Sequence, residues 1–318
     1  DEETGEYTFP SVTDKVQFGG AVLNGGLMEI SGGTIRNNNV GWRGAGIASY
    51  GKIEMTGGTI SGNYARNSWG DGGAIYLSGK KNDTGEDYTA SNASYCTIFD
   101  GNFTKNKSDG AGGAVCADGY SILYVKGGTF ENNAAATTGG GINVYSSCLR
   151  MSDGKISGNT AVSTDDSTGF GGGLNLTAGS VADITGGTIE NNQSNSGGGI
   201  YANGKSSFTA SNLKITGNTA ATNGGGICIP GTANYEYNVS LENVLIQGNK
   251  SESGSGAGIY AARAWQDETS TGRLTLTECR IKENQGTSSG GGVTITRQAR
   301  TTEDRQQSGE TEMGKKSI

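Results

Sequence analysis

Residues 186–204 read GGTIENNQSNSGGGIYANG, and nearly the same phrases stand at 127–142 (GGTFENNAAATTGGGI) and 57–75 (GGTISGNYARNSWGDGGAI). Each stretch joins an Ile/Phe-x-x-Asn phrase to a glycine-rich phrase that ends on an aliphatic residue. The Ile/Phe-x-x-Asn phrase stands at 35–38, 60–63, 103–106, 130–133, 156–159, 189–192, 215–218, 246–249 and 281–284. Self-similarity at a period of 20 to 50 residues is typical of solenoids and other stacked folds.

Apolar residues alternate with polar ones in short runs around both phrases. Met151 stands five residues before Ile156, and Ile142 of a glycine-rich phrase is followed two positions later by Val144. This period of two indicates strands, and no amphipathic helix pattern is present. One such unit cannot bury its own apolar row, but stacked units can. The sequence therefore predicts an all-β fold, a single-stranded right-handed parallel β-helix over residues 19–296 with nine to ten coils of about three short strands.

The asparagine of the Ile/Phe-x-x-Asn phrase has an expected structural role. Stacked coils would place each asparagine beside the one in the next coil, where side-chain amides can bond to one another in a ladder. Asparagine also tolerates the left-handed backbone of tight turns. The predicted ladder comprises Asn38, Asn63, Asn106, Asn133, Asn159, Asn192, Asn218, Asn249 and Asn284.

The paired phrases resemble the repeat of the polymorphic outer-membrane proteins. Its signature is Gly-Gly-Ala-Ile with Phe-x-x-Asn, matched by GGAI at 72–75 and FTKN at 103–106, and nearly by GGAV at 112–115 and FENN at 130–133. Most other copies carry isoleucine for phenylalanine and Gly-Gly-Gly for Gly-Gly-Ala. The resemblance implies a β-helical adhesin region on a bacterial surface, hence an extracellular, secreted or cell-surface location. The chain is also similar to the large Gly/Asn/Thr-rich β-helix surface proteins of gut bacteria.

Composition excludes several classes of partner and cofactor. The net charge is −7 with no basic stripe, so nucleic acid is not an expected partner. No apolar run is long enough to span a bilayer. The chain has no histidine, and its five cysteines show no CxxC spacing, so no metal or cofactor is expected. A monomer is expected, with a lateral trimer as the alternative.

The ends and the insertions lie outside the repeat. Residues 1–18 are acidic and are interpreted as an N-terminal cap over the open sheet edge. Residues 297–318 have almost no apolar content and are interpreted as a polar tail or cap. Long insertions at 78–95, 160–170 and 261–273 are expected at the edges of the coils, where a rigid solenoid presents its functional loops.

Aromatic residues provide the candidate binding positions. The residue after each glycine-phrase aliphatic is expected to point outward, which would place Tyr76, Tyr201 and Tyr260 on one face of the rod. Aromatic faces can stack on sugar rings, although tyrosine is also simply a common strand residue. Trp69 and Trp265, in two of the long turns, complete the candidate set.

An enzyme is the alternative interpretation, because many β-helices cleave polysaccharides. A hydrolase needs two carboxylates across the scissile bond, and the candidate pair is Asp165 and Asp166, with Asp71 and Asp109 in the same turn of earlier coils. Adjacent residues do not by themselves define an acid and a base. The sequence therefore favours a non-catalytic surface adhesin or stalk whose loops bind a host glycoprotein or glycan, with a polysaccharide lyase or glycoside hydrolase as the second hypothesis.

Overall fold

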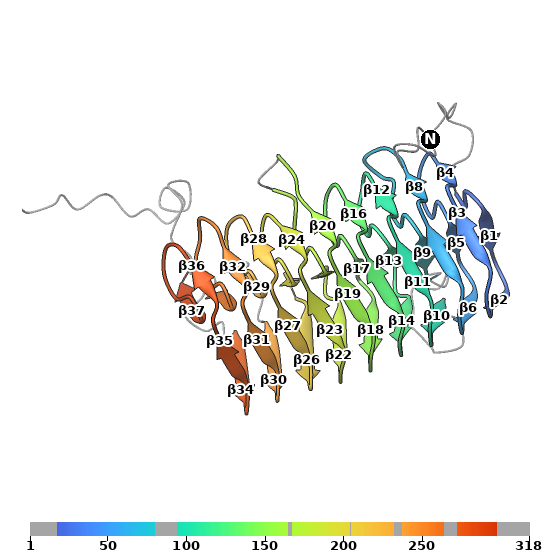
Figure 1. Ribbon diagram of the computed structural model, residues 1–318. Helices are drawn as coiled ribbons and strands as arrows, with labels where there is room; N and C mark the ends of the chain where they lie inside the picture. The colour runs from blue at the N-terminus through green and yellow to red at the C-terminus, as the bar shows by residue number, and fades with distance from the viewer. Residues whose placement is uncertain are drawn as a thin grey trace, which may run out of the picture.

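The computed structural model describes residues 18–79, 94–164, 167–203, 205–231, 237–263 and 272–297. These residues form a rod of stacked coils that runs from blue at its N-terminal end to red at its C-terminal end in Figure 1. Every strand pairing is parallel and joins one coil to the next, so each coil adds one strand to each of four sheets. The predicted right-handed parallel β-helix is confirmed.

The four sheets are called sheets I to IV in the order in which a coil visits them. Sheet I contains β1 (Val22–Asn24), β5 (Ile47–Ser49), β9 (Ile75–Ser78), β13 (Val115–Asp118), β17 (Ile142–Tyr145), β21 (Leu174–Thr177), β25 (Ile200–Ala202), β29 (Ile227–Ile229), β33 (Ile259–Arg263) and β37 (Val293–Arg297). Sheet II contains β2 (Leu27–Ile30), β6 (Lys52–Met55), β10 (Tyr95–Ile98), β14 (Ile122–Val125), β18 (Cys148–Met151), β22 (Val181–Ile184), β26 (Ser207–Ser211), β30 (Asn238–Glu242) and β34 (Arg273–Thr277).

Sheets III and IV complete each coil. Sheet III contains β3 (Thr34–Arg36), β7 (Thr59–Ser61), β11 (Asn102–Thr104), β15 (Thr129–Glu131), β19 (Lys155–Ser157), β23 (Thr188–Glu190), β27 (Lys214–Thr216), β31 (Leu245–Gln247) and β35 (Arg280–Lys282). Sheet IV contains β4 (Asn39–Val40), β8 (Tyr64–Ala65), β12 (Lys107–Ser108), β16 (Ala134–Ala135), β20 (Thr160–Ala161), β24 (Gln193–Ser194), β28 (Thr219–Ala220), β32 (Lys250–Ser251) and β36 (Gln285–Gly286). The two-residue strands of sheet IV are additional to the three strands expected in each coil.

The apolar core is a continuous column inside the coils. The register pairs equivalent residues of successive coils, so that Ile142 lies beside Leu174 and Ile156 beside Ile189, all fully buried. Phe103 and Phe130 stack with their ring centroids 4.7 Å apart. Because each coil buries its apolar residues against its neighbours, the stability of each coil depends on the coils beside it.

A chain of asparagine amides runs along the corner between sheets III and IV. From Asn38 to Asn284, the Nδ2 atom of each asparagine donates to Oδ1 of the next one at 2.9–3.0 Å. The same Oδ1 also accepts the backbone N–H of the preceding ladder residue, as in Asn133 to Asn159 at 2.9 Å. From Asn63 to Asn249 these side chains are at most 1% exposed. The ladder thus satisfies buried polar groups at a sharp corner of every coil.

Several expectations fall on residues that the structure does not describe. These are the N-terminal cap up to residue 17, the centres of the insertions at 78–95 and 261–273, and the C-terminal tail beyond residue 297. Their assignments remain predictions. Among the described residues there is no helix with the length and apolarity required to cross a membrane.

Candidate functional site

Two of the outward tyrosines of sheet I, Tyr76 and Tyr201, are covered by neighbouring parts of the chain. Tyr76 is 1% exposed and Tyr201 is 6% exposed, so their ring faces are not available to a sugar. Tyr201 instead stacks on Phe170, with the ring centroids 4.5 Å apart and the planes 5° from parallel. Tyr260 is half-buried, and its proposed binding role stays a prediction.

The physical reason lies in the turn that leads into each strand of sheet I. Gly139 has φ +65°, and a Cβ atom there would lie 2.7 Å from Cβ of Asn143. Gly197 has φ +68°, and its Cβ would likewise lie 2.7 Å from Cβ of Tyr201. Glycine alone adopts this left-handed turn without strain and with such close contact. The chain before each glycine therefore folds back over the outer face of sheet I.

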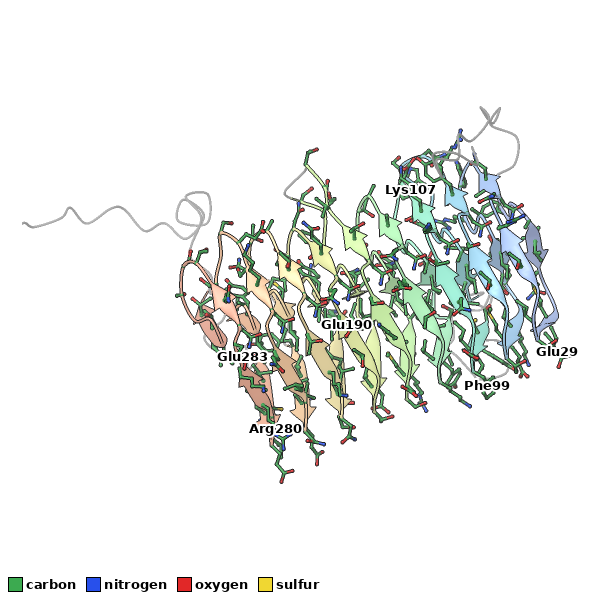
Figure 2. The ribbon with its side chains drawn as sticks, in the orientation of Figure 1. Glu29, Phe99, Lys107, Glu190, Arg280 and Glu283 are labelled. Carbon is green, nitrogen blue, oxygen red and sulfur yellow. The ribbon has the colours of Figure 1, made fainter. Side chains whose placement is uncertain are left out.

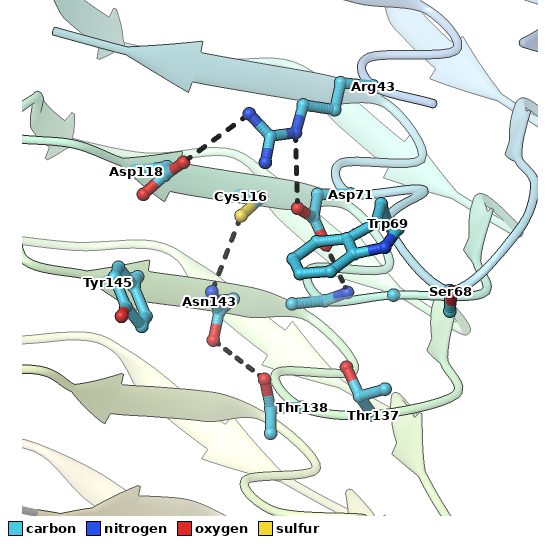
Figure 3. A pocket seen from close by; sticks show the side chains of 12 residues that line it. Arg43, Ser68, Trp69, Asp71, Cys116, Asp118, Thr137, Thr138, Asn143 and Tyr145 are labelled. Atoms are coloured by element: carbon cyan, nitrogen blue, oxygen red, sulfur yellow. Dashed lines mark hydrogen bonds and ion pairs between the residues drawn. The ribbon is translucent and has the colours of Figure 1, made fainter. Parts of the chain in front are cut away.

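A pocket of about 340 Å³ opens on this covered face near the N-terminal third of the rod. Its floor is formed by outward residues of β13 and β17, and its walls by the turns that precede β5, β9, β13 and β17 (Figure 3). The lining residues are Arg43, Ser68, Trp69, Asp71, Gly110, Ala111, Cys116, Asp118, Thr137, Thr138, Asn143 and Tyr145. The pocket therefore draws residues from four successive coils onto one surface.

Arg43 joins two carboxylates on one side of the pocket. Its Nε lies 3.6 Å from Asp71 Oδ2 and its Nη1 lies 3.9 Å from Asp118 Oδ2. The same Nη1 donates to the Tyr76 hydroxyl at 2.7 Å, and that hydroxyl donates to Asp118 Oδ2 at 2.7 Å. Asp71 Oδ1 accepts the backbone N–H of Ala111 at 2.8 Å. These contacts hold the charged groups in fixed positions.

Burial changes the acid–base properties of this cluster. Loss of hydration raises the pKa of the Asp71 carboxyl, and the Ala111 N–H and Arg43 oppose that rise. Burial also raises the pKa of the Tyr76 hydroxyl, and the hydrogen bond to Asp118 raises it further. The pKa of the buried Cys116 thiol is raised by burial and by the charges of Asp71 and Asp118. Both the phenol and the thiol are therefore neutral at physiological pH, and Cys116 is not a reactive thiolate.

Asn143 forms the polar floor of the pocket. Its Oδ1 accepts from Thr138 Oγ1 at 3.0 Å and from Asn175 Nδ2 at 2.7 Å, while its Nδ2 donates to Cys116 Sγ at 3.5 Å. The Asn143 oxygen and one of its two Nδ2 hydrogens are thus used within the protein, and the unshared oxygen sites of the two carboxylates are available as acceptors.

Two exposed aromatic side chains flank this floor. Trp69 is 66% exposed and Tyr145 is 49% exposed, and they stand on opposite sides of Cys116 and Asn143 in Figure 3. Trp69 is held by its turn, because Asn67 Oδ1 accepts the Trp69 N–H at 3.0 Å and Asp109 accepts the Asn67 N–H at 3.2 Å. Asp109 also accepts the Tyr64 hydroxyl at 2.7 Å.

The structure brings together a set of residues that differs from the predicted one. Trp69 lies in the pocket as a candidate binding residue, and Asp71 lies beside it. Sequence reasoning missed Arg43, Asp118 and Tyr145, because each is outward-pointing or in a turn and shares no motif with the others. The signal available in the sequence was the glycine that recurs in the turn before each strand of sheet I. This glycine marks where the chain folds over that sheet.

The other predicted site residues cannot be placed. Asp165, Asp166 and Trp265 lie outside the described residues. Within the described part of the chain, no group of three or more His, Cys, Asp or Glu side chains is arranged to hold a metal ion.

The stacked parallel coils and their asparagine-lined corner define the chain as a right-handed β-helix. The family model of the right handed beta helix region matches residues 169–305, and the model of the Chlamydia polymorphic membrane protein repeat matches residues 97–118. The second match includes β11, β12 and β13, and β13 supplies Cys116 and Asp118 to the pocket. The resemblance to the polymorphic membrane protein repeat is thus confirmed. No curated protein and no solved structure matches the chain.

Proposed function

We propose that this chain is the adhesin-like β-helical part of a bacterial surface protein and that the pocket on sheet I binds a glycan of a host glycoprotein or other carbohydrate. The repeat resemblance supports the surface location. The rigid rod supports a role in presenting a recognition site away from the cell. The protein acts by binding and leaves its ligand chemically unchanged.

One observation carries the glycan assignment. Trp69 and Tyr145 expose their rings on either side of a floor whose polar groups are fixed by hydrogen bonds. The apolar face of a sugar ring packs on aromatic rings, and its hydroxyls donate to fixed acceptors such as carboxylates. A pocket that combines exposed aromatic rings with a few convergent polar groups is the usual composition of a small-ligand site.

A glycan-binding screen followed by calorimetric titration tests this function. The purified chain is expected to bind a subset of arrayed glycans with saturation, and mass spectrometry is expected to find those glycans intact. Replacing Trp69 or Tyr145 by alanine removes one stacking partner, so affinity should fall about fivefold or more. Phe99→Ala is the matched control, because Phe99 is 43% exposed but follows β10 of sheet II, outside the pocket (Figure 2).

Equal affinities for the Trp69→Ala, Tyr145→Ala and Phe99→Ala variants would place any glycan binding elsewhere on the rod. Absence of saturable binding to every glycan would contradict the proposed recognition function and leave the chain as a spacer.

Carbohydrate cleavage is the second candidate function, favoured by the two carboxylates that share the pocket. Asp71 has a raised pKa, as a general acid requires, and Asp118 lies across Arg43 from it. The bridging arginine counts against this function, since it pairs with both carboxylates in the resting site and offsets one of their two negative charges. Shortened or unsaturated glycan products in the same mass spectra, lost in Asp71→Asn, would establish cleavage in place of simple binding.

A further inference from the structure

The charges of the pocket restrict the class of sugar that it can accept. Among the described residues that line it, the charged ones are Arg43, Asp71 and Asp118, which gives a formal charge of −1. The Arg43 side chain is 27% exposed, but its charge is shared between both carboxylates, and its Nη1 donates to Tyr76. No further cationic side chain lines the pocket within the described residues.

An anionic sugar would meet an unfavourable environment at this position. Its carboxylate or sulfate would lie beside two carboxylates that are partly desolvated, where like charges repel more strongly than in water. An anionic group that bound Arg43 would compete with Asp71 and Asp118 for its single positive charge, and its own charge would lie close to both carboxylates.

A neutral sugar has the complementary chemistry. Its hydroxyls are donors, and Asp118 keeps 25% of its side chain accessible after accepting the Tyr76 hydroxyl. The Asn143 oxygen already accepts from Thr138 and Asn175, so the carboxylate oxygens are the charged acceptors that the pocket offers to sugar hydroxyls. The C–H face of a pyranose ring fits against Trp69 or Tyr145, which lie at the rim.

From these contacts we infer that the pocket selects uncharged pyranose sugars and rejects sialylated, uronic-acid and sulfated ones. This inference rests on the proposed glycan-binding function, and it adds the charge class of the ligand. The aromatic rim supplies affinity for any sugar ring, whereas the Asp71–Arg43–Asp118 cluster supplies the discrimination.

Matched pairs of glycans test the selectivity directly. Gluco-, galacto- and manno-oligosaccharides are each compared with the uronic acid oligosaccharide of the same linkage and length, and lactose with sialyllactose, by calorimetry. For the pairs that bind, the neutral member should bind at least about tenfold more tightly at low salt. Added salt should reduce this difference in affinity, because it screens the repulsion between the acidic sugar and the carboxylates. The affinity for the neutral sugar should change little.

A charge-changing double variant sharpens the test. Asp71→Asn with Asp118→Asn changes the lining charge from −1 to +1, and asparagine can still accept the Ala111 N–H through its side-chain oxygen. The affinity for the acidic member of each pair should then rise at least about tenfold relative to the affinity for the neutral member. Asp153→Asn with Asp183→Asn is the control, since it changes the net charge of the chain equally at exposed positions outside the pocket.

Tighter binding of the acidic sugars to the unchanged protein would overturn the inference but not the proposed function. The inference would also be overturned if the Asp71/Asp118 double variant kept the preference for neutral sugars. The same change in preference in the Asp153/Asp183 control would overturn it too. Failure of every neutral and acidic glycan to bind would overturn the glycan-binding function itself, and the inference with it.

Discussion

The outer faces of sheets I and II show how one repeat pattern produces two different surfaces. On sheet I, the outward residues Tyr76, Cys116 and Asn143 are almost completely buried. On sheet II, the outward residues Arg150 and Asp183 are exposed, as expected for a strand that faces water. Both sheets alternate with a period of two, so the alternation determines which residues leave the core but not what covers them afterwards.

The difference arises from the connection that precedes each sheet. The chain enters sheet I through a glycine with positive φ and folds back over the strands. It enters sheet II through a turn that leaves the outer side chains of β18 and β22 open to water. A covered outer face allows fixed polar groups and a pocket, whereas an open face presents side chains directly to water. The candidate site is therefore on sheet I because the turns supply walls there.

The largest expected effect comes from disturbing the turn itself, by Gly139→Ala. The substitution combines left-handed strain with a clash against Ile142 O and Asn143 Cβ, both within 2.7 Å of the new atom. We expect the free energy of unfolding to fall by about 4 kcal/mol, measured by urea denaturation.

Gly179→Ala is the matched control for this substitution. Gly179 also has positive φ, at +78°, in the turn between sheets I and II, but its nearest neighbour would be Lys205 Cβ at 3.8 Å. Only the left-handed strain remains there, so the free energy of unfolding should fall by about 1–2 kcal/mol. Equal losses for the two variants would show that the turn over sheet I is not held by close packing.

Much of the architecture was predictable from the sequence, since the repeat and its alternation directly reflect stacking. Ile156 and Asn159 recur at fixed positions because every coil must place the same groups beside its neighbours. The pocket was not predictable in the same way. Arg43 and Asp118 come from different coils at different positions of the repeat, and only the folded turns bring them together. Tyr201 points away from the core, as expected, but its burial under the turn could not be read from the alternation.

The second prediction concerns an aromatic pair on the covered face. Tyr201→Ala removes a nearly buried ring that stacks on Phe170 and leaves a cavity under the turn, so unfolding should become easier by about 3 kcal/mol. Tyr124→Ala on sheet II, where the ring is half-buried, should cost about 1 kcal/mol or less. Urea denaturation measures both variants. If Tyr201→Ala and Tyr124→Ala lose similar amounts of unfolding free energy, the covering of sheet I contributes little to stability.

The smallest expected effect is a pH dependence on the covered face. Burial raises the pKa of the Tyr201 hydroxyl in the folded state, so the neutral phenol stabilises the fold fully below about pH 10, the pKa in the unfolded chain. That contribution is lost as the pH rises above this value, because the unfolded chain releases the proton more readily. Tyr201→Phe keeps the ring on Phe170 but has no proton to release. Between pH 10 and 11, the unchanged protein should therefore lose about 1 kcal/mol more unfolding free energy than the variant. Parallel stability curves for the two proteins would mean that the Tyr201 hydroxyl is hydrated, and that the outer face of sheet I is open to water at this coil.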